Sequence, residues 1–388
     1  YLVELPVDVK ENNLLWSKFS SPMETYKRHV EKLLKILTDK NLKAALVFNP
    51  ANIFYFTGTD APSATLIFED SRVVSISSRL EYLRAVEEHL IGEVYAFSRA
   101  TEVAEYEKII QGDLYESIKK LLEGMTPERI GVVGGSADLR QKLTEKIGPG
   151  FQDLSREVSL LRRQKDLDEL ERIKSAIRIG EYAMSKALNA LEKGVTEYEV
   201  VAEVLYAIHR NNATPSFDPI VAFGEHASHP HAKPSRRELQ EGDVVKIDLG
   251  ARVQGYCSDM TRTVIFGRVS TKQERIIRAV LRAQERAIEA LRAGVKAREV
   301  HMEAYRILKE EGLHNYFNHG LGHGVGIEIH EEPYLNAETE AELLVGDIVT
   351  VEPGVYMAGY LGVRIEDMIL VKEEGTELLT YFPKDYII

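Results

Sequence analysis

Four carboxylates and one histidine occupy positions in this chain where together they could bind metal ions. Asp248 and Glu352 each end a largely apolar run, VVKID and IVTVE, which has the character of a buried strand. An ionised carboxylate at the end of a buried strand is costly unless a cation or hydrogen bonds stabilise it. Asp259 and Glu366 are predicted on the strands that follow, and His323 lies in the glycine-rich segment GLGHGVG.

This set of side chains is rich in oxygen and contains a single imidazole, which suits divalent ions such as Mn²⁺, Co²⁺, Fe²⁺ or Zn²⁺. Carboxylates can bridge two such ions at about 3.5–4 Å, and the pair then lowers the pKa of a water molecule enough to give hydroxide near neutral pH. The set therefore predicts a two-metal hydrolase. The glycines around His323 are expected to let the backbone pass close to the metals.

An internal repeat relates the segments that carry these residues. LEKGVTEYEV at residues 191–200 matches LRAGVKAREV at residues 291–300 at half of its positions. Further on, GDVVKIDLG at residues 242–250 matches GDIVTVEPG at residues 346–354. The repeat aligns acids with acids and His231 with His330, as a shared polar site would require. It predicts a domain with pseudo-twofold symmetry whose sheets meet near that site.

The first part of the chain has the pattern of a small α/β domain. Helical spacing of apolar residues predicts helices, and short apolar runs bounded by turn residues predict strands. The expected elements are helices over residues 28–41 and 115–123, strands over 44–48 and 130–133, and a hairpin of 64–68 with 72–76 that turns at Asp70-Ser71.

The domain boundary is predicted at about residues 155–162, which divides the chain into residues 1–157 and 158–388. A long amphipathic helix is expected over residues 165–191 and should end at Gly194 in the left-handed conformation. Thr196 and Glu199 then form a predicted capping box for the next helix. The basic pair Arg162-Arg163 is interpreted as a solvent-exposed helix start. The expected fold class is α/β (α+β).

The composition limits the classes of partner. The chain has 388 residues, 44% of them hydrophobic, and a formal net charge of −12. Such an acidic chain is repelled by phosphate backbones and anionic lipids, so binding to nucleic acid or to a membrane is not expected. The single cysteine, Cys257, and the lack of a signal-peptide pattern at residues 1–10 lead us to expect a cytoplasmic protein.

Seven short motifs together resemble those of the prolidase, aminopeptidase P and methionine aminopeptidase family, which has the pita-bread catalytic fold. They are HPH at residues 229–231, IDLG at 247–250, SDMTRT at 258–263, HGLGH at 319–323, IHE at 329–331, VEPG at 351–354 and GVRIE at 362–366. The resemblance covers residues 165–388. The leading α/β domain fits the two-domain layout of prolidases and aminopeptidases P, and implies a creatinase/prolidase-type N-terminal domain.

The resemblance implies a role for each metal-binding side chain. Asp248 and Asp259 would bind one ion, His323 and Glu352 would bind the other, and Asp259 and Glu366 would bridge the two. Mn²⁺ or Co²⁺ are the first expectation for the metals, with Zn²⁺ or Fe²⁺ as alternatives.

The resemblance also implies roles around the substrate. Glu352 would act as general base and proton shuttle. His231 and His330 would contact the substrate carbonyl and the tetrahedral intermediate, while His319 and Arg364 would help to hold the substrate. In the implied reaction hydroxide attacks the carbonyl carbon, and Glu352 passes a proton to the leaving proline nitrogen.

These roles lead us to expect an Xaa-Pro dipeptidase (prolidase) that acts as a homodimer. The principal alternative is an Xaa-Pro aminopeptidase (aminopeptidase P) that acts on longer peptides. Two remoter alternatives share the fold, a creatinase-like amidinohydrolase and a non-catalytic binding homologue. Both usually lose the metal-binding acids, which are all present here.

Overall fold

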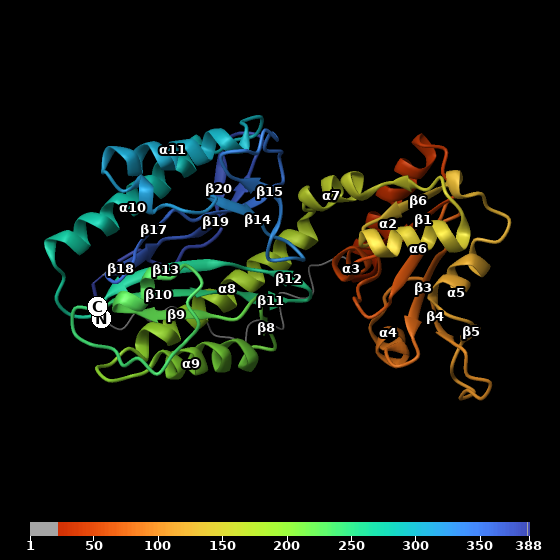
Figure 1. Cartoon of the computed structure of the whole chain (residues 1–388), viewed down its shortest axis with the longest axis horizontal. Helices are drawn as coiled ribbons and strands as arrows, with labels where there is room; N and C mark the ends of the chain where they lie inside the picture. Colours follow the sequence, from red (N-terminus) through yellow and green to blue (C-terminus); the bar gives the residue numbers. More distant parts are fainter. Residues whose placement is uncertain (1–21, 386) are drawn as a thin grey trace. The chain divides into compact units, whose positions relative to one another are not determined.

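The computed structural model describes residues 22–385, 387 and 388, and Figure 1 labels its helices and strands. The described chain divides into two compact units, residues 22–162 and residues 163–388. None of the helices in these residues combines the length and the apolar character needed to cross a membrane.

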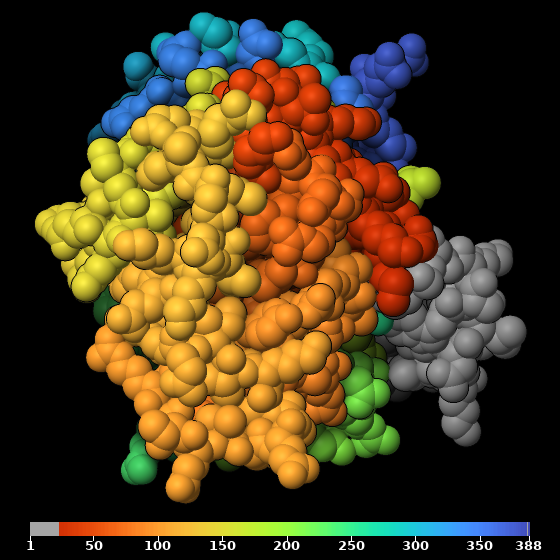
Figure 2. Space-filling model, turned by 90° about the vertical axis from the view of Figure 1, so that its right-hand side faces the viewer, coloured from red at the N-terminus to blue at the C-terminus, as the bar shows by residue number. Residues whose placement is uncertain are grey.

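A seven-stranded sheet forms the centre of the N-terminal unit. Its helices are α2 (Pro22–Asp39), α3 (Pro50–Thr57), α4 (Tyr82–Glu88), α5 (Leu114–Leu121), α6 (Ala137–Ile147) and α7 (Ser155–Arg163), and its strands are β1 (Ala44–Val47), β2 (Ala64–Phe68), β3 (Val73–Ser78), β4 (Glu93–Ser98), β5 (Ile109–Gln111), β6 (Ile130–Val133) and β7 (Gln152–Asp153). The strand order is β5-β4-β3-β2-β1-β6-β7, and the strands mix parallel and antiparallel pairs. In the space-filling view the residues of this unit are those coloured from red to yellow (Figure 2).

The elements predicted for this unit are present. The predicted strands at residues 44–48 and 130–133 correspond to β1 and β6, and β2 and β3 form the predicted antiparallel hairpin. Asp70 accepts a hydrogen bond from the backbone N–H of Arg72 at 3.1 Å, and Ser71 has a left-handed φ of 72°. The first predicted helix begins earlier than expected, at Pro22 instead of Arg28.

The C-terminal unit begins with two helices that pack on a small sheet. Its first half contains α8 (Leu167–Asn189), α9 (Glu197–Arg210), β8 (Thr214–Pro215), β9 (Ile220–Phe223), the 3₁₀ helix η4 (Gly224–Ser228), β10 (Val244–Leu249), β11 (Ala251–Val253), β12 (Tyr256–Cys257) and β13 (Met260–Ile265). β10 is the central strand between β9 and β13. α8 and α9 lie against this sheet (Figure 1), and apolar side chains of α8, α9, β9 and β10 form the core of this half.

The second half repeats the arrangement of two helices followed by strands. It contains α10 (Thr271–Ala290), α11 (Ala297–Glu310), η5 (His314–Tyr316), β14 (Gly322–Gly324), β15 (Glu331–Leu335), β16 (Ile348–Val351), β17 (Gly354–Met357), β18 (Leu361–Arg364), β19 (Asp367–Val371) and β20 (Thr376–Leu378). Its main sheet has the order β15-β14-β16-β19-β20, and α10 and α11 cover its core.

Matched backbone contacts confirm the predicted repeat. Gly194 N donates to Leu239 O at 3.0 Å, and the aligned Gly294 N donates to Leu343 O at 2.8 Å. The returning bonds also match, from Leu239 N to Val195 O at 2.8 Å and from Leu343 N to Val295 O at 2.9 Å. The two halves adjoin at β13, where Glu366 N donates to Thr261 O at 3.1 Å.

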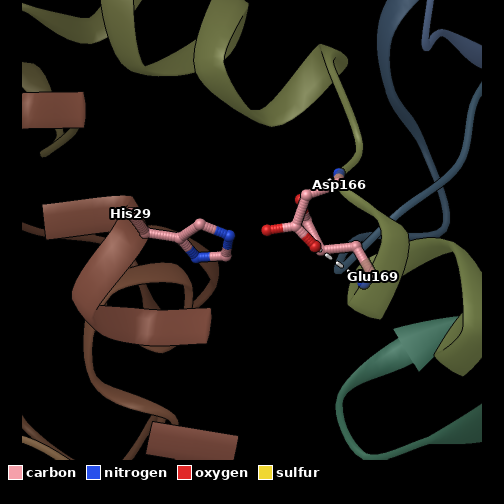
Figure 3. Close-up of side chains that lie close together, drawn as sticks. All are labelled: His29, Asp166 and Glu169. Atoms are coloured by element: carbon pink, nitrogen blue, oxygen red, sulfur yellow. Dashed lines mark hydrogen bonds between the residues drawn. The ribbon is translucent and has the colours of Figure 1, made fainter. Parts of the chain in front are cut away.

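Helix α8 begins close to where the sequence predicted but ends earlier than predicted. Asp166 and Glu169 form a capping box at its first turn, in which each side chain accepts a backbone N–H of the other residue (Figure 3). The predicted cap at Gly194 is wrong, because the helix already ends at Asn189 and Gly194 lies in the following turn with a φ of 90°. The predicted capping box of Thr196 and Glu199 is confirmed at the start of α9.

The interpretation of Arg162 and Arg163 as a solvent-exposed pair is wrong. Both lie at the end of α7 and are buried, 8% and 5% exposed. Arg163 donates to both carboxylate oxygens of Asp347, at 2.9 and 2.6 Å, and Asp347 is fully buried. Arg162 donates to Asn52 at 2.9 Å within the N-terminal unit. The pair is buried because each guanidinium has a fixed acceptor, which stabilises a charge away from water.

Candidate metal centre

The five side chains of the predicted metal set come from both halves of the C-terminal unit. Asp248 lies on β10, His323 is the middle residue of β14, and Glu352 directly follows β16. Asp259 and Glu366 were predicted on strands, and this is a small correction: they lie immediately before β13 and β19. Strand pairing begins only at the next residue in each case, so both acids occupy the ends of the sheets.

The structure brings all five side chains together in one cavity of about 770 Å³. Ligand atoms of Asp259, His323 and Glu366 lie within 4.8 Å of one another. His323 Nε2 is 3.2 Å from Glu352 Oε1 and 3.6 Å from Asp259 Oδ2. Asp248 lines the same cavity from β10. Residues that the repeat aligns, Asp248 and Glu352, therefore face a common space.

Two threonine hydroxyls fix the orientation of the acids. Thr261 Oγ1, on β13, donates to Glu366 Oε2 at 2.7 Å. Thr350 Oγ1, on β16, donates to Glu352 Oε1 at 3.3 Å and accepts the backbone N–H of His323 at 3.1 Å. Both threonines are fully buried, so these hydrogen bonds are protected from competition with water.

The glycines around His323 allow β14 to lie very close to its neighbours. A Cβ atom at Gly322 would lie 2.0 Å from the carbonyl oxygen of Thr350, and one at Gly324 would lie 2.3 Å from that of Glu332. Only glycine fits at such distances. The close approach in this segment is therefore to the adjoining strands β16 and β15, and the approach to metal ions stays a prediction.

The carboxylates in the cavity oppose one another's ionisation. Burial raises the pKa of Asp259 well above its usual range, and the charges of the neighbouring carboxylates raise it further. Burial and the neighbouring carboxylates likewise raise the pKa of Glu366. Burial alone would raise the pKa of Glu352, but the hydrogen bond and charge of His323, together with the charges of Arg364 and His319, outweigh burial and lower it to about 2. A divalent cation among these groups would favour their ionised forms.

Asp248 supplies a direct test of whether the residues fit a metal ion. Its Oδ2 pairs with Arg364, whereas Oδ1 is buried and accepts no hydrogen bond from the described residues. A buried carboxylate oxygen without a partner is destabilising, and a cation would satisfy it. Four carboxylates and one imidazole are also the donor types that divalent ions such as Mn²⁺ or Co²⁺ accept. The residues fit.

The three further histidines predicted from the sequence also line the cavity. The ring of His330 lies 4.3 Å from that of His323. His319 Nδ1 is 2.6 Å from the carbonyl of Gly320, and its Nε2 is 3.0 Å from the Tyr356 hydroxyl. Because a carbonyl only accepts, Nδ1 of His319 carries the proton. His231 is the third member, with an exposed side chain.

Arg364 lies in the cavity wall, fully enclosed by protein partners. Its Nη2 pairs with Asp248, its Nε donates to Thr261 at 3.1 Å, and its Nη1 donates to the Tyr356 hydroxyl at 2.8 Å. Nη1 also donates to the carbonyl of Pro230 at 3.3 Å. The guanidinium therefore orients Asp248 and Tyr356, a role that the sequence analysis did not predict.

Sequence reasoning missed several polar residues that support the site. Thr261 and Thr350 donate hydrogen bonds to the metal-site acids, and the Tyr356 hydroxyl contacts His319 and Arg364. Lys246 Nζ lies 5.1 Å from the centre of the Tyr356 ring. Thr261 and Thr350 stand in strand runs where threonine is common, so their types gave no signal. Lys246 could have been noticed, because a lysine inside an otherwise apolar strand run requires a buried partner.

Comparison with known proteins gives two family matches. Residues 171–373 match the model of metallopeptidase family M24, and residues 29–164 match the creatinase/prolidase N-terminal domain. The chain is 36% identical to an Xaa-Pro dipeptidase from Pyrococcus furiosus over 358 residues, which cover 91% of this chain and 98% of that protein.

Two solved structures match this chain over a length that includes both units. The prolidase from Pyrococcus horikoshii matches with a TM-score of 0.81 and 32% identity, over 93% of this chain and 100% of that one. An X-Pro aminopeptidase from Thermotoga maritima matches with a TM-score of 0.82 and 30% identity, over 92% and 99%. The C-terminal unit thus has the pita-bread fold, as predicted, and enzymes of this family use divalent metal ions. The chain belongs to metallopeptidase family M24 and is a metallopeptidase.

Proposed function

We propose that this chain binds two divalent metal ions and hydrolyses the peptide bond between an N-terminal residue and proline. Asp248 and Asp259 would bind one ion, His323 and Glu352 the other, and Glu366 would bridge both together with Asp259. Mn²⁺ and Co²⁺ are the proposed metals, with Zn²⁺ and Fe²⁺ as alternatives. The observation that carries the proposal is the convergence of these five side chains on one cavity.

Bound divalent ions supply a nucleophile near neutral pH by lowering the pKa of a water molecule. Glu352 is the proposed general base, because its carboxylate lines the cavity beside the other proposed metal ligands and is oriented there by Thr350. It would accept a proton and then pass this proton to the leaving proline nitrogen. His231 and His330 would donate to the carbonyl oxygen as negative charge develops on it. His319, fixed by Tyr356, would help to hold the substrate.

The proposed substrates are Xaa-Pro dipeptides. The assignment is supported by the Pyrococcus furiosus relative, which is named an Xaa-Pro dipeptidase and matches along nearly its whole length. The alternative of an Xaa-Pro aminopeptidase is supported by the similarity to the Thermotoga maritima structure. Arg364 would favour a dipeptide if it met the carboxylate of proline, but that carboxylate would have to share the guanidinium with Asp248.

We expect Met-Pro to be hydrolysed with a kcat/KM about tenfold higher than that of Met-Pro-Ala. A free proline carboxylate would share the Arg364 guanidinium with Asp248, and a tenfold preference corresponds to about 1.4 kcal/mol. The measurement is the ratio of kcat/KM for the two peptides with one metal-loaded preparation. Pro-Met, with proline first, serves as the control and should not be cleaved. A ratio below one would assign the protein to the aminopeptidases P.

We also propose that the protein is a homodimer. It is proposed to act in the cytoplasm, and its domain boundary is proposed at residues 157–158. Three apolar side chains at and beside α4, Leu80, Leu83 and Val86, are exposed by 89%, 59% and 40%, which supports an interface on the N-terminal unit. Light scattering at micromolar concentration should give twice the 43.8 kDa of one chain. A mass of one chain would argue against the dimer. The buried, unpaired thiol of Cys257 is compatible with a reducing compartment.

A further inference from the structure

The loop of residues 224–235, here called the His231 loop, carries His231 into the cavity. The side chain of His231 is exposed there, and it makes no hydrogen bond with any residue that the structure describes. The position of its ring is therefore set by its own backbone. The loop begins as η4 and continues without regular structure, so the contacts that hold its backbone decide where the imidazole lies.

A buried lysine holds the middle of this loop. Lys246 lies on β10 and its side chain is completely buried. Its Nζ donates to three carbonyl oxygens of the loop, those of Ala227 at 3.0 Å, His229 at 2.6 Å and Pro230 at 3.2 Å. An ammonium group has three N–H donors, so all of them are used on this loop.

The carbonyl of Pro230 is the most informative of the three acceptors. It belongs to the planar peptide unit that also contains the backbone N of His231, so fixing this oxygen fixes the direction in which the chain enters His231. Arg364 Nη1 donates to the same oxygen at 3.3 Å. Two buried basic side chains thus donate to the peptide unit that precedes the histidine.

A buried carboxylate holds the ends of the loop. Glu197, at the start of α9, is 0% exposed and accepts hydrogen bonds from Phe223 N at 2.8 Å and Ser235 N at 2.8 Å. It also accepts from Ser235 Oγ at 2.6 Å and from His226 Nδ1 at 2.8 Å. An anion therefore binds donors on both sides of the loop, while a cation binds carbonyls in its middle.

We propose that Lys246 and Glu197 are positioning residues that hold His231 in its place for catalysis. The inference rests on the proposed function, in which His231 donates to the substrate carbonyl oxygen. Burying two ionisable side chains is costly, and this loop contains none of the proposed metal ligands, so stability alone is a poor explanation for them. What the two residues share is that both hold the backbone of the loop that carries His231.

The experiment is a double-mutant cycle with Lys246→Met and His231→Ala on the metal-loaded protein, with Ala-Pro as substrate. Methionine keeps the length and the apolar stem of lysine but removes its three donors. A displacement of about 1 Å in a catalytic group lowers turnover by up to about 100-fold, so we expect Lys246→Met to lower kcat by roughly 10- to 100-fold with a small change in KM. In the His231→Ala background the same substitution should lower kcat by less than about twofold.

Val300→Ala is the control for general destabilisation. Val300 is fully buried in α11, in the other half of the unit, and the substitution should lower the melting temperature while leaving kcat unchanged. Glu197→Gln provides a second test at the ends of the loop and should show the same dependence on His231. It replaces Lys246→Met if that variant does not fold. Equal losses of kcat with and without His231 in a folded variant would overturn the proposal.

Amide hydrogen exchange of residues 224–235 separates this proposal from the proposed function. Lys246→Met should speed exchange in the His231 loop at least about tenfold while α11 stays protected, whether or not Ala-Pro is a substrate. If the parent protein does not cleave Ala-Pro, the proposed function fails, and the positioning role is then judged from hydrogen exchange alone. Unchanged exchange of residues 224–235 in Lys246→Met would overturn the positioning role. If the parent cleaves Ala-Pro and the cycle is additive, only the positioning role fails.

Discussion

Glu352→Gln is expected to lower kcat for Ala-Pro by about 10²–10⁴-fold, the usual effect of losing a general base. Glutamine has nearly the shape of glutamate and can still accept the hydrogen bond from Thr350, so the fold should be retained. It cannot accept a proton from water at neutral pH. Because Glu352 is also a proposed metal ligand, the metal content of the variant is measured as well; in a variant that keeps its metal the lost step is proton transfer, and the change should appear mainly in kcat.

Glu340→Gln is the matched control for this substitution. Glu340 is a half-exposed glutamate that pairs with Lys296 and Arg298 and does not line the cavity. An exposed pair of this kind contributes little, so activity should remain within about twofold of the parent. Circular dichroism and melting temperature should be those of the parent for both variants. A Glu352→Gln enzyme within about tenfold of the parent would remove Glu352 from the catalytic role.

Exhaustive removal of divalent metal is expected to abolish hydrolysis, by at least about a thousandfold, and addition of Mn²⁺ or Co²⁺ should restore it. The reason is visible in Asp259 and Glu366, whose pKa values are raised by burial first and then by repulsion from neighbouring carboxylates. A cation between these carboxylates stabilises their ionised forms, so metal should also raise the melting temperature by binding the native state. Metal content is measured by mass spectrometry alongside activity.

Asp259→Asn distinguishes loss of metal from damage caused by the chelator. This variant lacks one proposed bridging carboxylate and should gain little activity or thermal stability when metal is added. The parent treated in the same way should recover both. Undiminished activity in protein shown to be free of metal would contradict the two-metal site.

The repeat is the reason that so much of the site could be predicted from the sequence. Aligned strand runs placed Asp248 opposite Glu352, and the structure brings these residues to one cavity from β10 and the end of β16. The periodic helices and the hairpin of the N-terminal unit were equally accessible, since local apolar spacing and turn residues determine them.

The residues that could not be predicted are those whose partners are distant in sequence. Arg163 looked like an exposed helix residue because nothing local indicates its buried partner Asp347. Tyr356 binds His319 and Arg364 only once three separate segments have come together. The left-handed Gly194 was read as a helix cap, although the same conformation is used in the turn that follows α8.

The most direct test of the central claim is the release of free proline from Ala-Pro by the metal-loaded protein, quantified against Ala-Ala under the same conditions. The account predicts stoichiometric alanine and proline from Ala-Pro, with little hydrolysis of Ala-Ala. No proline from Ala-Pro, or equal hydrolysis of Ala-Ala, would contradict the assignment as an Xaa-Pro dipeptidase.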